Sequence, residues 1–184
     1  QTRLKTPAYQ KKWYAKKDRA GGGHLAWLGI HWLDLATYLT ETHATHITGF
    51  AANVGGQPLD VEDSAAVALR YANGTLGTLT SGYYLDRSYH THIKIWGSHG
   101  WLQLERWGGK TLTWQSWKPG AKAGVQTWEG RDEPRGYTPF VQAAVKAAAG
   151  LADAPISSLD SLRALQMVYG LYRAQETGQT QAIA

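Results

Sequence analysis

An imidazole and a carboxylate, His31 and Asp34, stand three residues apart in an apolar segment that follows three consecutive glycines, Gly21–Gly23. Residues three or four apart share one face of a helix, so both side chains would face the same side. An imidazole titrates near neutral pH, which suits it to take up or release a proton in acid–base catalysis. The spacing is also compatible with a core histidine whose hydrogen bonds are satisfied, and with a carboxylate that caps or pairs inside the fold.

Histidines elsewhere offer a second kind of chemistry, metal binding. His43 and His46 are separated by two residues, and His90 and His92 by one. These spacings, like that of the pair above, suit two ligands of one metal ion. No third ligand is indicated, and no partner that would orient the ligands is evident. We therefore expect no metal.

The glycines offer a third possibility, a loop that holds the phosphates of a nucleotide. Such loops follow a β-strand and open a helix. Gly21–Gly23 precedes an apolar helical segment but follows charged sequence without strand character. No other glycine-rich turn has the pattern of a dinucleotide site, so the residues that bind a cofactor are unknown.

A helix is expected over about residues 24–40, and it would carry the acid–base pair. One apolar stripe recurs at three- and four-residue spacing: Leu25, Leu28, Trp32, Leu35, Ala36 and Leu39. A second stripe lies beside it: His24, Trp27, His31, Asp34 and Tyr38. Few strongly polar residues remain, so we expect this helix to be buried on most sides.

From about residue 46 the apolar period changes to two, which predicts strands. The expected strands are 46–54, 63–71, 75–85, 90–96, 101–106 and 111–117. Asn73-Gly74 predicts a tight hairpin with positive φ at both central positions. Short connections favour antiparallel pairing. Residues 118–136, rich in Gly, Pro and charge, are expected to form a long loop.

Two helices are expected to close the chain. The first has Thr138 as N-cap and Pro139 at its first position. The second runs from about 158 to 176 and stops at Gly178, with an inner face of Leu159, Leu162, Leu165, Val168, Tyr169 and Tyr172. This order predicts an α+β fold, an open, mainly antiparallel sheet with helices packed on one face. A partner subunit is a natural cover for the other face.

Composition and charge narrow the classes of protein. The chain has 184 residues, 43% of them hydrophobic, which suits one domain with a sizeable core. No run of about 18 apolar residues occurs, so we expect no membrane partner. The net charge of +5 is concentrated in residues 3–19, beside several aromatic residues. No nucleic-acid-reading motif follows, so we expect no nucleic-acid partner but a solvated segment, or one that lies against another domain or subunit.

The start of the chain resembles the middle of a longer protein. It begins at Gln1 without an initiator Met or the apolar region of a signal peptide. We expect a cytoplasmic protein, while an export signal upstream stays open. Nine Trp and ten Tyr suit a domain that binds sugars or forms interfaces, although such residues also fill cores.

Residues 21–34, read as GGGHLAWLGIHWLD, resemble the G-G-G-x-L-x-D-x-G-x-H-x-x-D signature of the glucose–fructose oxidoreductase, inositol dehydrogenase and MocA (Gfo/Idh/MocA) family. Three further segments are similar to that family: the strand–hairpin–strand from Val61, the turn from Ile95 to Leu104, and the closing helices from Phe140 to Gly178. The resemblance covers nearly all of the chain in order. It implies the C-terminal, substrate-binding domain of an NAD- or NADP-dependent enzyme that oxidises or reduces a sugar, inositol or related polyol.

The resemblance also implies where the domains and the site lie. Residues 1–20 would be a basic lead-in from an absent N-terminal Rossmann domain, which binds the cofactor, and residues 21–184 the substrate-binding and oligomerisation domain. His31 would be the catalytic acid–base group. The residues expected to contact substrate are Trp27, Asp34, Tyr83, Tyr84, Arg87 and His90. The expected partners are a small sugar or polyol, the absent domain, and further copies of the chain in a homodimer or homotetramer formed through the sheet face.

One position departs from the family pattern. The family usually has Asp four residues before the histidine, and this chain has Trp27. An indole carries no proton, but it can stack on a sugar ring or pack in a core. Two functions therefore stay open: an oxidoreductase domain that uses His31, and a non-catalytic sugar-binding or assembly module that kept the fold and lost the chemistry.

Overall fold

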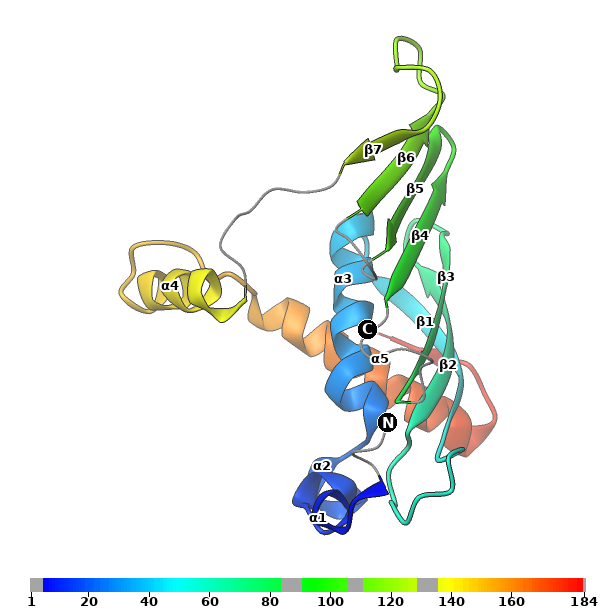
Figure 1. Cartoon of the computed structure of the whole chain (residues 1–184), viewed down its shortest axis with the longest axis vertical. Helices are drawn as coiled ribbons and strands as arrows, with labels where there is room; N and C mark the ends of the chain where they lie inside the picture. Colours follow the sequence, from blue (N-terminus) through cyan, green and yellow to red (C-terminus); the bar gives the residue numbers. More distant parts are fainter. Residues whose placement is uncertain (1–4, 84–90, 106–110, 129–135, 184) are drawn as a thin grey trace. The chain divides into compact units, whose positions relative to one another are not determined.

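The computed structural model describes residues 5–83, 91–105, 111–128 and 136–183. They belong to two compact units, one formed by residues 1–84 and 154–184 and the other by residues 85–153. The described part of each unit contains one four-stranded antiparallel sheet together with helices (Figure 1). The expected α+β fold is confirmed, with the strands divided between two sheets.

The sheet of the first unit has the order β3-β2-β1-β8. Its strands are β1 (Ala44–Ala52), β2 (Ser64–Tyr71), β3 (Leu76–Gly82) and β8 (Gln181–Ala182). Burial alternates strictly along β2, where Val67 and Leu69 are buried while Ala66 and Ala68 are exposed. One face of the sheet therefore packs on the core and the other is open to solvent.

The hairpin between β2 and β3 lies where the sequence predicts it, but its turn is different. Gly74 donates its N–H to the carbonyl of Tyr71 at 2.9 Å, so Ala72 and Asn73 are the central residues. Gly74 has φ +85°, whereas Asn73 does not have positive φ. The side-chain oxygen of Asn73 accepts a hydrogen bond from the N–H of Thr75 at 3.1 Å. The expectation of two central residues with positive φ was wrong, because the glycine follows the turn.

Helices cover the inner face of this sheet. A π-helical turn, η3 (Leu25–Gly29), runs directly into α3 (Ile30–Thr40), and α5 (Ser158–Thr177) packs against both β1 and α3 (Figure 1). The oxygen Oγ of Ser157 accepts from the N–H of Asp160 at 3.0 Å, and Gly178 ends α5 with φ 67°. The buried core comprises Leu25, Leu33, Ile47, Val67, Leu69, Tyr71, Met167, Val168 and Leu171, with three alanines.

The buried face of α5 is not the expected one. The helix buries Ala164, Met167, Val168, Leu171 and Ala174, while Leu159, Leu162, Leu165 and Tyr169 are about half exposed. The reason is close packing on β1. A Cβ at Gly170 would lie 2.9 Å from Cγ2 of Ile47, so α5 approaches the sheet through its small residues.

Helix α3 is also less buried than expected. Leu33 is the one fully buried side chain on α3, and His31, Tyr38 and Leu39 are exposed. The helix thus presents one stripe to the core and a second to solvent.

The N-terminal segment forms three short helices, α1 (Pro7–Gln10), η2 (Trp13–Ala15) and α2 (Lys17–Ala20). Ala15 is fully buried against Leu59 and Val61, and tyrosine rings pack around them. This small cluster attaches the segment to the first unit.

The second unit contains β4 (His92–Gly97), β5 (Gly100–Glu105), β6 (Thr111–Ser116), β7 (Gln126–Trp128) and α4 (Tyr137–Ala148). Strand β7 lies inside the expected loop. Helix α4 begins one residue before Thr138, with Gly136 as its N-cap, so the capping expectation was wrong. In the described ranges, no helix has both the length and the apolar character that a membrane crossing requires.

Candidate functional site

The glycine triplet forms a close-packed entry to the helix that carries His31. Gly21 ends α2 with φ 73°, in the left-handed region that favours glycine. The next two glycines are required by space. A Cβ at Gly22 would overlap the hydroxyl of Tyr172, and one at Gly23 would overlap the carbonyl oxygen of Glu62. The triplet thus brings the start of the helix against α5 and the residues just before β2.

Glu62 holds the start of that helix. Its carboxylate accepts the N–H of Gly23 at 2.6 Å and that of Leu25 at 2.9 Å, and the hydroxyl of Tyr172 donates to it at 2.7 Å. The carbonyl of Glu62 accepts the N–H of His24 at 2.9 Å. A negative charge here satisfies N–H groups that a helix start leaves free and matches the helix dipole. Burial, together with the charge and hydrogen bond of Glu62, raises the pKa of the Tyr172 hydroxyl.

The buried imidazole of this segment belongs to His24. The ring lies edge-on to Tyr83, with centroids 4.5 Å apart, and Nε2 is 2.5 Å from Oγ of Ser81 on β3. Burial lowers the pKa of His24 to about 4, and the nearby charge of Asp63 opposes that shift only in part. His24 is therefore neutral at physiological pH and has a structural role.

His31 lies on the exposed side of α3. Its helix is fixed at one end by Glu62 and along its inner side by Leu25 and Leu33. The π-helical turn η3 immediately precedes it, a feature that often occurs near functional sites. Within the described part of the chain, no hydrogen bond joins His31 to Asp34. Asp34 is half-buried, and its backbone carbonyl accepts from the hydroxyl of Thr37 at 2.6 Å.

Trp27 lies one turn before His31 and contacts the N-terminal segment. Its indole packs against Trp13 with ring centroids 5.0 Å apart, and against Tyr14 at 6.4 Å. Trp27 keeps 40% of its surface exposed, so it is supported by these rings without being covered. The structure thus brings together Trp27 and Trp13, a neighbour that the sequence did not indicate.

Of the other expected contact residues, Tyr83 falls within the described ranges. Tyr83 contacts the ring of His24, and its phenol oxygen lies 3.5 Å from that of Tyr9. Tyr84, Arg87 and His90 lie outside the described residues. The described ranges also contain no group of three or more His, Asp or Glu side chains arranged to hold a metal ion.

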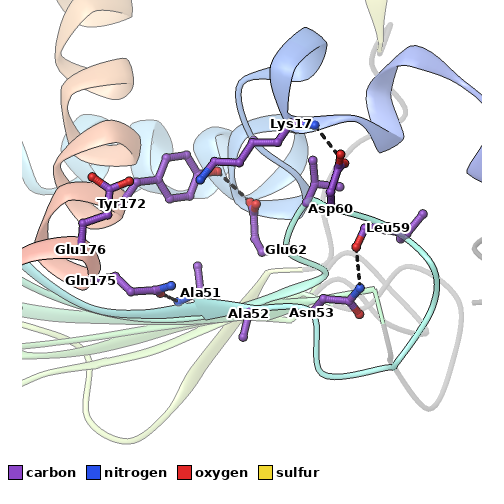
Figure 2. A pocket seen from close by; sticks show the side chains of 12 residues that line it. Lys17, Ala51, Ala52, Asn53, Leu59, Asp60, Glu62, Tyr172, Gln175 and Glu176 are labelled. Atoms are coloured by element: carbon purple, nitrogen blue, oxygen red, sulfur yellow. Dashed lines mark hydrogen bonds between the residues drawn. The ribbon is translucent and has the colours of Figure 1, made fainter.

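A pocket of about 230 Å³ has Glu62 among its lining residues (Figure 2). Lys17, Asp60, Tyr172 and Glu176 line it among others. The carboxylate of Glu62 is committed to the contacts above, and Asp60 accepts the N–H of Lys17 at 2.9 Å. Most ionisable groups that line the pocket are thus engaged in hydrogen bonds that hold the fold together. His31 is not among the residues that line the pocket.

Comparison with known proteins places the chain in a family. The sequence profile of the GFO/IDH/MocA C-terminal domain matches residues 1–103, more than half of the chain and including the glycine triplet and His31. The chain belongs to the GFO/IDH/MocA family. No curated protein sequence matches it.

Solved structures of low sequence identity share the GFO/IDH/MocA fold of this chain. An oxidoreductase domain protein from Kribbella flavida is 23% identical with a TM-score of 0.80, covering 94% of this chain and 53% of its own. An aldose-aldose oxidoreductase from Caulobacter crescentus, complexed with glycerol, is 20% identical with a TM-score of 0.77. The match covers 94% of this chain and 51% of that protein. The WlbA dehydrogenase from Bordetella pertussis, in complex with NADH and UDP-GlcNAcA, is 18% identical with a TM-score of 0.74. The match covers 97% of this chain and 51% of that protein. The chain therefore spans about half the length of these relatives.

Proposed function

We propose that this chain is the substrate-binding and oligomerisation domain of an NAD(P)-dependent oxidoreductase acting on a sugar, inositol or related polyol. The observation that carries the proposal is the position of His31. Its imidazole is exposed on a helix whose start is fixed by Glu62, in a chain of the GFO/IDH/MocA family. An exposed imidazole on a fixed helix suits proton transfer, whereas a core histidine would be buried as His24 is.

His31 would move the proton of the reaction. A bound nicotinamide supplies a hydride acceptor or donor. As the substrate carbon loses hydride, its hydroxyl proton passes to the imidazole of His31, and in the reverse direction the imidazole returns it. Trp27 and Asp34, on the same helix, would contact the substrate, as would Tyr83, Tyr84, Arg87 and His90.

The cofactor would be held mainly by another domain. The described residues form antiparallel sheets with helices, without the parallel βαβ unit that binds a dinucleotide. The relatives complexed with NADH or glycerol are about twice as long as this chain. Both observations support a cofactor-binding domain preceding residues 1–20, and neither selects NAD or NADP.

The experiment is an assay of the natural polypeptide with both cofactors. Its mass is measured first, because a mass near twice 20.2 kDa supports a preceding dinucleotide domain. Reduction of NAD⁺ and NADP⁺ is then followed with aldoses, inositols and linear polyols. Turnover with a member of these classes supports the proposal, and its absence with every member contradicts it.

Trp27 favours a second candidate, a sugar-binding or assembly module without dehydrogenase activity. The indole occupies the position of the usual family Asp and packs on Trp13 and Tyr14. This candidate predicts sugar binding without nicotinamide-dependent turnover, so the same assay combined with a binding measurement separates the two.

A further inference from the structure

Trp13 and Trp27 form an exposed aromatic corner on the first unit. They keep 49% and 40% of their surface exposed, their ring centroids lie 5.0 Å apart, and their planes meet at 60°. Contiguous apolar side chains on a surface mark interaction or ligand-binding sites, whereas single ones are normal. An indole face covers the apolar C–H face of a sugar ring and leaves the hydroxyl groups free for hydrogen bonds.

The corner is held in place from both sides. Trp13 begins η2, whose last residue, Ala15, is fully buried against Leu59 and Val61. Trp27 lies on η3, immediately after the glycine entry. A ligand would meet two rings that are already positioned, which reduces the conformational entropy lost on binding.

Exposed lysines flank Trp13 in the sequence. Lys12 and Lys16 bracket η2, since the carbonyl of Lys12 accepts the N–H of Ala15 at 3.0 Å and the N–H of Lys16 donates to the carbonyl of Trp13 at 3.1 Å. Both side chains are exposed, as is that of Lys11. In the described ranges, no carboxylate forms an ion pair with these three ammonium groups. These exposed positive charges therefore lie on the short segment that carries Trp13.

We propose that the Trp13–Trp27 corner is a subsite for a sugar ring that carries a negatively charged substituent, a carboxylate or a phosphate, recognised by Lys12 and Lys16. This inference rests on the proposed function for one point only, that the ring bound here is the one that reacts at His31. The inference names anionic sugars as the substrate class. A neutral sugar would contact the two rings but not the lysines.

The test is calorimetric titration of the natural polypeptide with glucuronate, glucose 6-phosphate and glucose, each with and without NAD⁺ or NADP⁺. We expect at least one charged sugar to bind about tenfold more tightly than glucose. Raising the salt from about 0.05 M to about 0.5 M should reduce this preference, because salt screens exposed charges. A preference for glucuronate identifies a carboxylate, and one for glucose 6-phosphate a phosphate. Equal affinities for all three sugars would overturn the inference.

Substitutions separate the rings from the charges. Trp13→Ala should weaken binding of charged and neutral sugars by about three- to tenfold, and Trp13→Phe by less. The double substitution of Lys12 and Lys16 by Gln should weaken only the charged sugars, by a few fold. Trp117→Ala and Lys122→Gln, at exposed positions in the second unit, are the matched controls.

Two further results would overturn the inference. One is unchanged sugar affinity in the Trp13→Ala variant. The other is a lysine double variant that loses affinity for NADP⁺ but not for the charged sugars, which would assign the charges to the cofactor. Because titration reads binding without turnover, failure of this inference is distinguishable from failure of the proposed oxidoreductase function.

Discussion

Gly23 and Glu62 contact each other twice. The N–H of Gly23 donates to Oε2 of Glu62 at 2.6 Å, and the Cα of Gly23 faces the carbonyl oxygen of Glu62 so closely that a Cβ would overlap it. The two residues are 39 positions apart in the sequence. This contact joins the start of the site helix to the residues just before β2, so the position of His31 depends on it.

Replacing Gly23 by Ala should therefore be strongly destabilising. The added methyl group meets backbone, which cannot rotate away, so we expect a loss of about 3 kcal/mol in the free energy of unfolding. Urea denaturation measures this loss. Gly97→Ala is the matched control, since a Cβ there would lie 3.8 Å from its nearest neighbour. Equal stability of the two variants would show that Gly23 does not pack closely against the carbonyl oxygen of Glu62.

The hydrogen bond between Tyr172 and Glu62 should appear as a coupling energy. Tyr172→Phe removes one donor and should cost about 1 kcal/mol, and Glu62→Gln should cost about 2 kcal/mol, because the amide presents a donor toward backbone N–H groups. In the double variant the two losses should fall short of their sum by about 1 kcal/mol. Tyr169→Phe, at a half-exposed position of the same helix, should change little. Additive losses would mean that the bond contributes nothing.

Stability should fall in mild acid because of His24. In the unfolded chain its imidazole binds a proton near pH 6.5, whereas in the folded chain its pKa is about 4. The unfolded state thus binds more protons than the folded state between pH 4 and pH 6.5. The folded protein therefore keeps its full stability above pH 6.5, and protonation of His24 in the unfolded chain lowers the free energy of unfolding as the pH falls toward 4. The full loss is about 3 kcal/mol.

Urea denaturation between pH 7 and pH 4 measures this dependence. A His24→Asn variant should show a flatter profile than the parent, and His99→Asn, at an exposed position, should not. Identical slopes for the parent and the His24 variant would show that His24 is not buried as a neutral ring.

The exposed sheet face should mediate self-association. Phe50 on β1 is 76% exposed and lies opposite Ala66 on β2. A charge there should dissociate the expected homodimer or homotetramer, because it would be buried without a partner. Analytical ultracentrifugation of a Phe50→Asp variant measures the mass, with Leu151→Asp, 77% exposed in the second unit, as control. An unchanged oligomer would place the interface elsewhere.

The sequence predicted most elements because their signals are local. The period of two located the strands, and the three- and four-residue spacing located α3 and α5. The face that α5 buries was not predictable, because this helix carries apolar residues on two sides. The choice depends on how closely Gly170 approaches Ile47, which is a long-range contact.

At the site too, local signals could be predicted and long-range contacts could not. His24 and His31 lie on the same stripe in the sequence, and only the contact of His24 with Ser81 shows which imidazole is buried. Glu62 was missed as the residue that holds the helix, because its partners Gly23 and Tyr172 are 39 and 110 residues away. The unpaired N–H groups of a helix start after glycine were the one available signal that such a carboxylate must exist.

The most direct test of the proposed function is the turnover of a His31→Ala variant of the natural polypeptide, measured with the affinity for the nicotinamide cofactor. Loss of an acid–base group should lower kcat by about 10²- to 10⁴-fold and leave cofactor binding and the urea midpoint unchanged. His99→Ala should keep full activity. Undiminished turnover in the His31→Ala variant would contradict the account.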